Sequence, residues 1–190
     1  MLAQLSARYG GRVRVMDVLG VRVEMPTNQP IVLLRERGSD RHLPIWIGAA
    51  EASAIAYAQQ GIVPPRPLTH DLLVNVLATL GHHLGRIRIT TLTDGAFHAV
   101  LELTAPDGSV REVDSRSSDA IALALRTGAE IVAEDQLLNE VAVRIAEEEP
   151  RSDAEAEEGD SEVLAEFTKF LDTVSPEDFE TGPETPGATS

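Results

Sequence analysis

Two short segments of the chain combine cationic, hydroxyl and carboxylate side chains just before predicted helices. The first runs from Arg66 to Asp71 and reads Arg-Pro-Leu-Thr-His-Asp, and the second runs from Asp114 to Asp119 and reads Asp-Ser-Arg-Ser-Ser-Asp. A helix N-terminus presents free backbone N–H groups and the positive end of the helix dipole, so an arginine beside it can hold a phosphate. The two segments therefore indicate a candidate site for an anionic ligand.

Phosphoryl chemistry would give each type of side chain in these segments a role. Arg66 and Arg116 would bind phosphate, while carboxylates would bind a divalent cation or activate water. A histidine can donate or accept a proton near neutral pH. The candidates for the acidic and proton-transfer roles are Asp71, Asp114, Asp119 and His70.

The same residues are also typical of helix N-termini that have no role beyond stability. Serine and threonine are ordinary N-cap residues, and aspartate is favoured in the first turn of a helix in any protein. This alternative applies to Thr69, Ser117, Ser118, Asp71 and Asp119. Glu51, at the start of an alanine-rich predicted helix, has the same two interpretations. Spacing alone leaves open whether the carboxylates converge.

Several enzyme classes lack their signature in this sequence. There is no Gly-rich phosphate loop followed by Lys-Ser or Lys-Thr, no dinucleotide-binding glycine pattern and no Gly-x-Ser-x-Gly turn. The chain has no cysteine, which excludes disulfides, thiolate zinc sites and a cysteine nucleophile. Its five histidines show no paired spacing suited to zinc.

Hydrophobic periodicity predicts two groups of strands, each followed by helices. Strands are predicted at 13–15, 21–23, 31–34 and 43–47, with helices at 50–60 and 71–80. The second group has strands at 87–93, 97–104 and 110–113, a helix at 119–126, a short segment at 130–133 and a last helix at 135–147. Gly20 is interpreted as a break between strands, and Asp94-Gly95 as a tight hairpin turn.

A shift of 66 residues aligns the two groups without gaps. Val21-Arg22-Val23 falls on Ile87-Arg88-Ile89, Glu36 falls on Glu102, and the segment 54–58 falls on 120–124. One such unit is too small to bury a hydrophobic core by itself. We therefore predict an α+β fold in which internally duplicated β-β-β-α-α units share one core.

The composition of the chain changes after residue 147. Residues 1–146 contain 14 Arg and 16 Asp plus Glu, whereas residues 147–190 contain two basic and 15 acidic residues. We predict one domain at 1–147, an acidic linker at 148–160, an amphipathic helix with a C-terminal motif at 161–180, and a disordered tail at 181–190. The apolar face of the helix at 162–174 needs a partner surface, either on its own domain or on another protein. Such an acidic tail argues weakly against avid binding to nucleic acid.

The sequence also predicts the setting in which the protein works. No stretch reaches the ~18 apolar residues of a membrane span, and no signal peptide is recognisable at the N-terminus. We expect a cytoplasmic protein without membrane contact. A homodimer is the expected assembly, because closed pairs are the commonest oligomers.

Four segments resemble motifs of the bifunctional nuclease (BFN) domain family. They are Leu-Pro-Ile-Trp-Ile-Gly at 43–48, Glu51-Ala52, Arg-Pro-Leu-Thr-His-Asp-Leu-Leu at 66–73, and Asp-Ser-Arg-Ser-Ser-Asp-Ala-Ile-Ala-Leu-Ala at 114–124. The similarity covers approximately residues 10–140. The segment 170–179 resembles the C-terminal extension of actinobacterial members. The resemblance implies a compact, internally duplicated α+β domain that forms homo-oligomers and degrades both DNA and RNA.

The family's motif residues can be carried over position by position. They are Glu51, Arg66, Thr69, His70, Asp71, Asp114, Arg116, Ser118 and Asp119. Ser117 stands where the family usually has a proline, which would relax the turn that presents Arg116 because proline pre-sets the entry into a helix.

Three functional interpretations follow. The resemblance favours a nuclease with little sequence preference, assisted by Mg²⁺ or Mn²⁺ at Asp71, Asp114 and Asp119. The alternative is a non-catalytic regulatory module that binds an anion or nucleotide and recruits a protein partner through its C-terminal helix. In a third interpretation the motif arginines form only structural ion pairs, with Asp114 or Glu51, inside a dimer interface.

Overall fold

The computed structural model describes residues 11–144, which form eight strands and four helices. All of them belong to the compact unit Met1–Ala146. The predicted linker at 148–160, the helix at 162–174 and the tail at 181–190 lie outside the described residues.

The predicted order of strands and helices recurs twice along the chain. The first repeat consists of β1 (Val13–Glu24), β2 (Gln29–Glu36), β3 (Arg41–Trp46), α1 (Ala49–Gln59) and α2 (Thr69–Thr79). The second consists of β4 (His83–Thr93), β5 (Ala96–Thr104), β6 (Val110–Arg116), α3 (Ser117–Thr127), β7 (Glu130–Glu134), α4 (Asp135–Val141) and β8 (Val143–Arg144). The α+β class and the duplication are confirmed, with β7 and β8 as additions to the second repeat.

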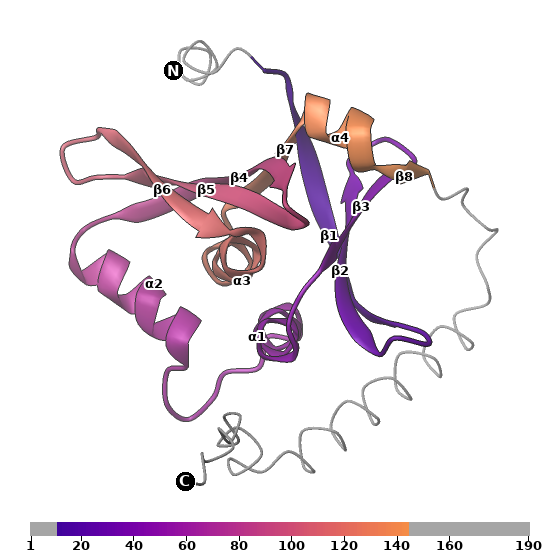
Figure 1. Cartoon of the computed structure of the whole chain (residues 1–190). Helices are drawn as coiled ribbons and strands as arrows, with labels where there is room; N and C mark the ends of the chain where they lie inside the picture. The colour runs from indigo at the N-terminus through magenta and orange to yellow at the C-terminus, as the bar shows by residue number, and fades with distance from the viewer. Residues whose placement is uncertain (1–10, 145–190) are drawn as a thin grey trace, which may run out of the picture. The chain divides into compact units, whose positions relative to one another are not determined.

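The two repeats join into one sheet through β7. The strand order is β6-β5-β4-β7-β1-β2-β3-β8, and β7 runs parallel to β4 and antiparallel to β1. Helix α1 packs on β1 and β2, α3 packs on β4 to β7, and the two helices pack on each other, as can be followed in Figure 1. Residues of the first turns of α1, α2 and α3 line one groove together with residues of β5 and β6.

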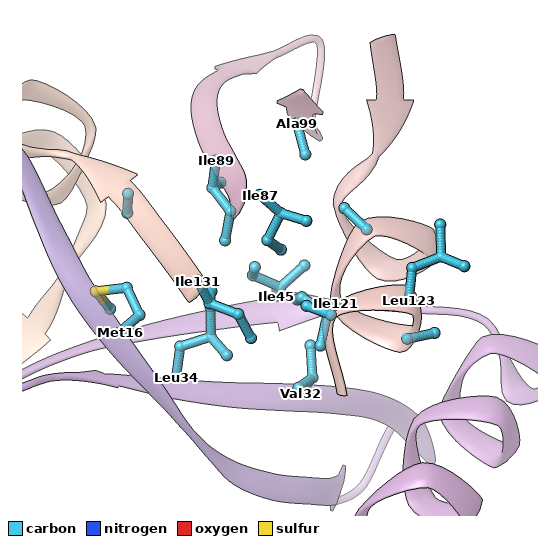
Figure 2. Packing of buried hydrophobic residues seen from close by; sticks show 14 of the residues in the cluster. Met16, Val32, Leu34, Ile45, Ile87, Ile89, Ala99, Ile121, Leu123 and Ile131 are labelled. Atoms are coloured by element: carbon cyan, nitrogen blue, oxygen red, sulfur yellow. The ribbon is translucent and has the colours of Figure 1, made fainter. Parts of the chain in front are cut away.

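Both repeats contribute to a single hydrophobic core. Figure 2 shows Val32 and Leu34 of β2, Ile87 and Ile89 of β4 and Ile121 of α3 within one cluster of buried side chains. Ile121 and its counterpart at the 66-residue shift, Ile55 of α1, are fully buried. Neither repeat could therefore keep its own core intact without the other.

Helix α2 is packed differently from α1 and α3. It contains no buried residue and packs mainly on α3. Several of its apolar side chains, including Leu72, Leu73 and Val76, are exposed. Apolar burial therefore contributes less to holding α2 than to holding the other helices.

Gly20 does not separate two strands, contrary to the prediction. β1 is continuous from Val13 to Glu24, and its pairing with β2 shifts register between Val18 and Gly20. Gly20 has a φ of +148°, which a residue with a Cβ rarely adopts, so glycine permits a bulge that bends the strand without ending it.

The helix predicted at 135–147 is confirmed only in its N-terminal half. α4 ends at Val141, and Ala142 is extended, with φ −68° and ψ 139°. Val143 and Arg144 then pair with β3 as β8. The β-branched residues on both sides of Ala142 favour a strand here, and the free edge of β3 supplies the partner.

Two further predictions concern turns and helix starts. The Asp94-Gly95 hairpin is confirmed, because both residues have positive φ and join β4 to β5 directly. Thr69 is not the N-cap of its helix; the N-cap is Leu68, and the helix begins at Thr69. Among the described residues no helix is long and apolar enough to cross a membrane.

Candidate functional site

Three helix N-termini carry the residues of the candidate site. Glu51, Asp71 and Asp119 are each the third residue of their helix, in α1, α2 and α3 respectively. A carboxylate at this position is favoured by the helix dipole and can accept hydrogen bonds from free backbone N–H groups. Arg116 is the N-cap of α3, where β6 passes into the helix without a loop.

The Arg116 guanidinium joins two of these carboxylates. Its Nε lies 2.7 Å from Asp119 Oδ2 and its Nη2 lies 3.0 Å from Asp119 Oδ1, a bidentate arrangement. Its Nη1 lies 2.8 Å from Glu51 Oε1. The side chain nevertheless keeps 67% of its surface exposed, so the guanidinium is accessible to a ligand.

His70 lies on the other side of Asp119. Its Nε2 is 3.0 Å from Asp119 Oδ1, across 49 residues of sequence. Burial alone would raise the pKa of Asp119, but hydrogen bonds from Arg116 and His70 outweigh it, so the pKa lies below its usual value of 3.8. Asp119 is thus an anion at neutral pH that holds both His70 and Arg116.

These side chains open into a groove of about 1040 Å³ between α1, α2, α3 and β6. The predicted residues that line it are Glu51, Thr69, His70, Asp114, Arg116 and Asp119. Sequence reasoning missed Ser53, Tyr57 and Ser115, which also line it. Tyr57 lies in the alanine-rich sequence of α1, which carries no motif that would indicate a site. Ser115 lies inside the candidate segment 114–119.

Arg66 and Ser118 are not among the residues that line the groove. Arg66 is exposed, and Ser118 is buried at the second position of α3. Their predicted contacts with substrate stay predictions.

Asp71 belongs to a separate cluster. Its Oδ1 lies 2.6 Å from Arg126 Nε, and its Oδ2 accepts a hydrogen bond of 2.9 Å from the Leu68 N–H. The ion pair with Arg126 and, more weakly, the Leu68 N–H hold the pKa of Asp71 below its usual value of 3.8, although burial opposes them. Asp71 and Arg126 line a second hollow of about 620 Å³, which shares Tyr57 with the groove.

The three carboxylates predicted to bind metal therefore do not form one ligand set. Asp71 is engaged by Arg126, while Asp119 is engaged by Arg116 and His70. Among residues 11–144, no group of three or more His, Asp or Glu side chains is placed to hold a metal ion. Sequence spacing predicted the three helices with starts within two residues of those observed, but not which helix starts face each other.

The two depressed carboxyl pKa values predict acid sensitivity. Asp71 and Asp119 have lower pKa values in the folded protein than usual, so they stabilise the fold above about pH 4, and this stabilisation is lost as the pH falls through the folded values. Urea unfolding from about pH 6 down to about pH 3 measures the loss. Asp71→Asn should flatten the acid limb of the curve; an unchanged limb would contradict this assignment.

Comparison with known proteins agrees with the motifs. The model of the bifunctional nuclease domain matches residues 32–146. An uncharacterized protein of Mycobacterium tuberculosis is 49% identical over 170 residues, which covers 89% of this chain and 98% of that protein. A protein named Bifunctional nuclease 1 from Oryza sativa subsp. indica is 30% identical over 129 residues, which covers 64% of this chain and 38% of the rice protein. Because the family model spans more than half of the sequence, the chain belongs to the bifunctional nuclease domain family.

Proposed function

We propose that the protein hydrolyses phosphodiester bonds of DNA and RNA in the groove between α1, α2, α3 and β6, with little sequence preference. The observation that carries the proposal is the cluster of Glu51, His70, Arg116 and Asp119, drawn from three helix N-termini that are far apart in the sequence. Family membership and the protein named Bifunctional nuclease 1 support the reaction type.

Arg116 is the residue of this proposal that binds phosphate. Its guanidinium is exposed, planar and able to make paired hydrogen bonds to phosphate oxygens. A ligand phosphate would take over donors that now contact Glu51 and Asp119. Contacts to phosphate carry no base information, so a site of this kind predicts little sequence preference.

His70 is the residue of this proposal that moves the proton. When its Nε2–H donates to Asp119, the lone pair lies on Nδ1, which can accept a proton from an attacking water. The water oxygen then bonds to phosphorus, the P–O bond to the leaving group breaks, and the leaving oxygen takes up a proton from solvent. The protonated His70 returns its proton to solvent. Asp119 orients the imidazole through its contact with Nε2.

The requirement for Mg²⁺ or Mn²⁺ stays a prediction, and no step above depends on it. The predicted ligands do not fit a shared metal, because Asp71 faces Arg126 and Asp119 already holds two partners. The predicted roles of Asp71 and Asp114 in catalysis also stay predictions. Asp114 lines the groove and is available to substrate.

A survey of substrates tests the proposal. Purified protein is incubated with single- and double-stranded DNA and RNA, with Mg²⁺, with Mn²⁺ or with chelator. We expect cleavage that co-elutes with the protein in gel filtration. Absence of cleavage on all four substrates in every condition would reject the nuclease and favour the binding module. The chelator arm decides whether a divalent cation takes part.

Glu51→Gln is expected to tighten binding of nucleic acid. Glu51, Asp114 and Asp119 give the groove three carboxylates against one arginine, and Glu51 neutralises part of Arg116. Removing its charge should lower the Kd for a phosphorothioate oligonucleotide about two- to fivefold, the range of an exposed ion pair. Fluorescence anisotropy at low salt measures this. Glu130→Gln, which removes the 2.9 Å ion-pair partner of Arg86 on β4, is the control. Weaker binding by Glu51→Gln would show that Glu51 contacts the ligand favourably.

The proposal also includes two kinds of protein–protein contact. A homodimer, and a protein partner for the helix at 162–174, are both predicted from the sequence. Their tests are the mass in solution and hydrogen exchange of the helix amides in the isolated protein. Protected amides would favour docking on the protein's own domain, and fast exchange would favour an external partner.

A further inference from the structure

Arg126 is a nearly buried cation that sequence reasoning missed. It lies in the last turn of α3, and its side chain is 10% exposed. It does not line the groove that contains His70 and Arg116. A guanidinium removed from water in this way requires hydrogen-bond acceptors or an opposite charge, and Arg126 has both.

The contacts of Arg126 reach all three helices of the site. Its Nε donates to Asp71 Oδ1 of α2 at 2.6 Å. Its Nη1 donates to the Ala54 carbonyl of α1 at 2.9 Å and to the Ala122 carbonyl of α3 at 3.0 Å. One side chain therefore connects the helices that carry Glu51, His70 and Asp119.

Helix α2 is the element that depends most on this connection. It has no fully buried residue, and its apolar contacts with the hydrophobic core come from two partly buried side chains, Val74 and Leu77. Asp71 connects Arg126 to the start of α2. One of its carboxylate oxygens pairs with Arg126, and the other, Oδ2, accepts a hydrogen bond from the Leu68 N–H at the N-cap. His70 directly precedes Asp71, and its 3.0 Å contact with Asp119 is the link between α2 and the Arg116 cluster.

We infer that Arg126, acting through Asp71, is a positioning residue that sets His70 against Asp119. The inference rests on the proposed nuclease function for its kinetic consequence, but the geometry it describes holds for any ligand of the groove. The inference also gives Asp71 a different role from the predicted catalytic and metal-binding one. Asp71 lines the second hollow and not the groove, so it positions His70 without contacting a ligand of the groove.

The test combines kinetics with a direct observation of His70. The variants are Arg126→Gln and Arg126→Lys, with Arg86→Gln as the matched control, because Arg86 on β4 makes an ion pair of 2.9 Å with Glu130. For each variant kcat and KM are measured on an oligonucleotide. The imidazole ¹⁵N resonances of His70 report whether Nε2 keeps its hydrogen bond.

Arg126→Gln should lower kcat about 10²-fold, the effect of a misplacement of about 1 Å, and should leave KM within twofold. The His70 resonances should move toward those of a free imidazole. Arg126→Lys should restore part of kcat and reverse part of the change in the His70 resonances, because lysine keeps one donor for Asp71. Arg86→Gln should change neither kcat nor the His70 resonances. Should Arg126→Gln not fold, Asp71→Asn replaces it, since asparagine still accepts the Leu68 N–H.

His70 resonances that stay unchanged in the folded variant would overturn the inference, whatever happens to kcat. A fall in kcat that Arg86→Gln reproduces would also overturn it. If the wild-type protein cleaves no substrate, the proposed function fails, but the resonances still decide whether Arg126 positions His70.

Discussion

His70→Gln is expected to lower kcat about 10²- to 10⁴-fold, the range contributed by a general acid or base. Glutamine can still contact Asp119, but it cannot accept and release a proton near neutral pH. KM should change little, because Arg116 and not His70 is proposed to bind phosphate. The melting temperature should stay within a few degrees, since His70 has its ring in the groove wall and not in the core.

Steady-state kinetics on a single oligonucleotide measure the effect. His98→Gln is the matched control, because His98 lies exposed on β5 and is not among the groove residues. Equal losses in both variants would point to a general effect on the fold. Full activity of His70→Gln would remove His70 from the mechanism.

Ile55→Ala and Ile121→Ala are each expected to lower the free energy of unfolding by about 2–5 kcal/mol, as for other large-to-small changes in a packed core. Both side chains are fully buried, and they occupy corresponding positions in the two repeats. Leu80→Ala should cost less than about 0.5 kcal/mol, because Leu80 is 62% exposed.

Urea unfolding, followed by the fluorescence of Trp46 in the first repeat and by circular dichroism, measures the three variants. We expect one transition with both probes, because the repeats share a core. If Ile121→Ala left the Trp46 transition in place while circular dichroism shifted, the repeats would be independent units.

Much of this fold could be predicted because its signals are local. Alternating apolar residues and the Asp94-Gly95 turn specify the second meander without reference to the rest of the chain. The 66-residue repeat then predicted the order of elements. Gly20 was misinterpreted because a glycine that ends a strand and a glycine that forms a bulge have the same sequence context.

The candidate site was less predictable because it depends on how helices pack. Each acidic helix start was recognised, but nothing in the spacing of Asp71 and Asp119 shows that one faces Arg126 and the other faces His70. Arg126 had no signal of its own, since an arginine in the last turn of a helix is favoured by the dipole in any protein. Only the packing of α2 on α3 assigns its role.

The measurement that tests the central claim most directly compares cleavage by the wild-type protein and by Asp119→Asn, purified in parallel, on the same single-stranded oligonucleotide. Asparagine keeps the size of the side chain but removes the charge that holds both His70 and Arg116. We predict that cleavage is lost while the melting temperature changes by a few degrees at most. Equal cleavage by both proteins would contradict the assignment of the activity to this site.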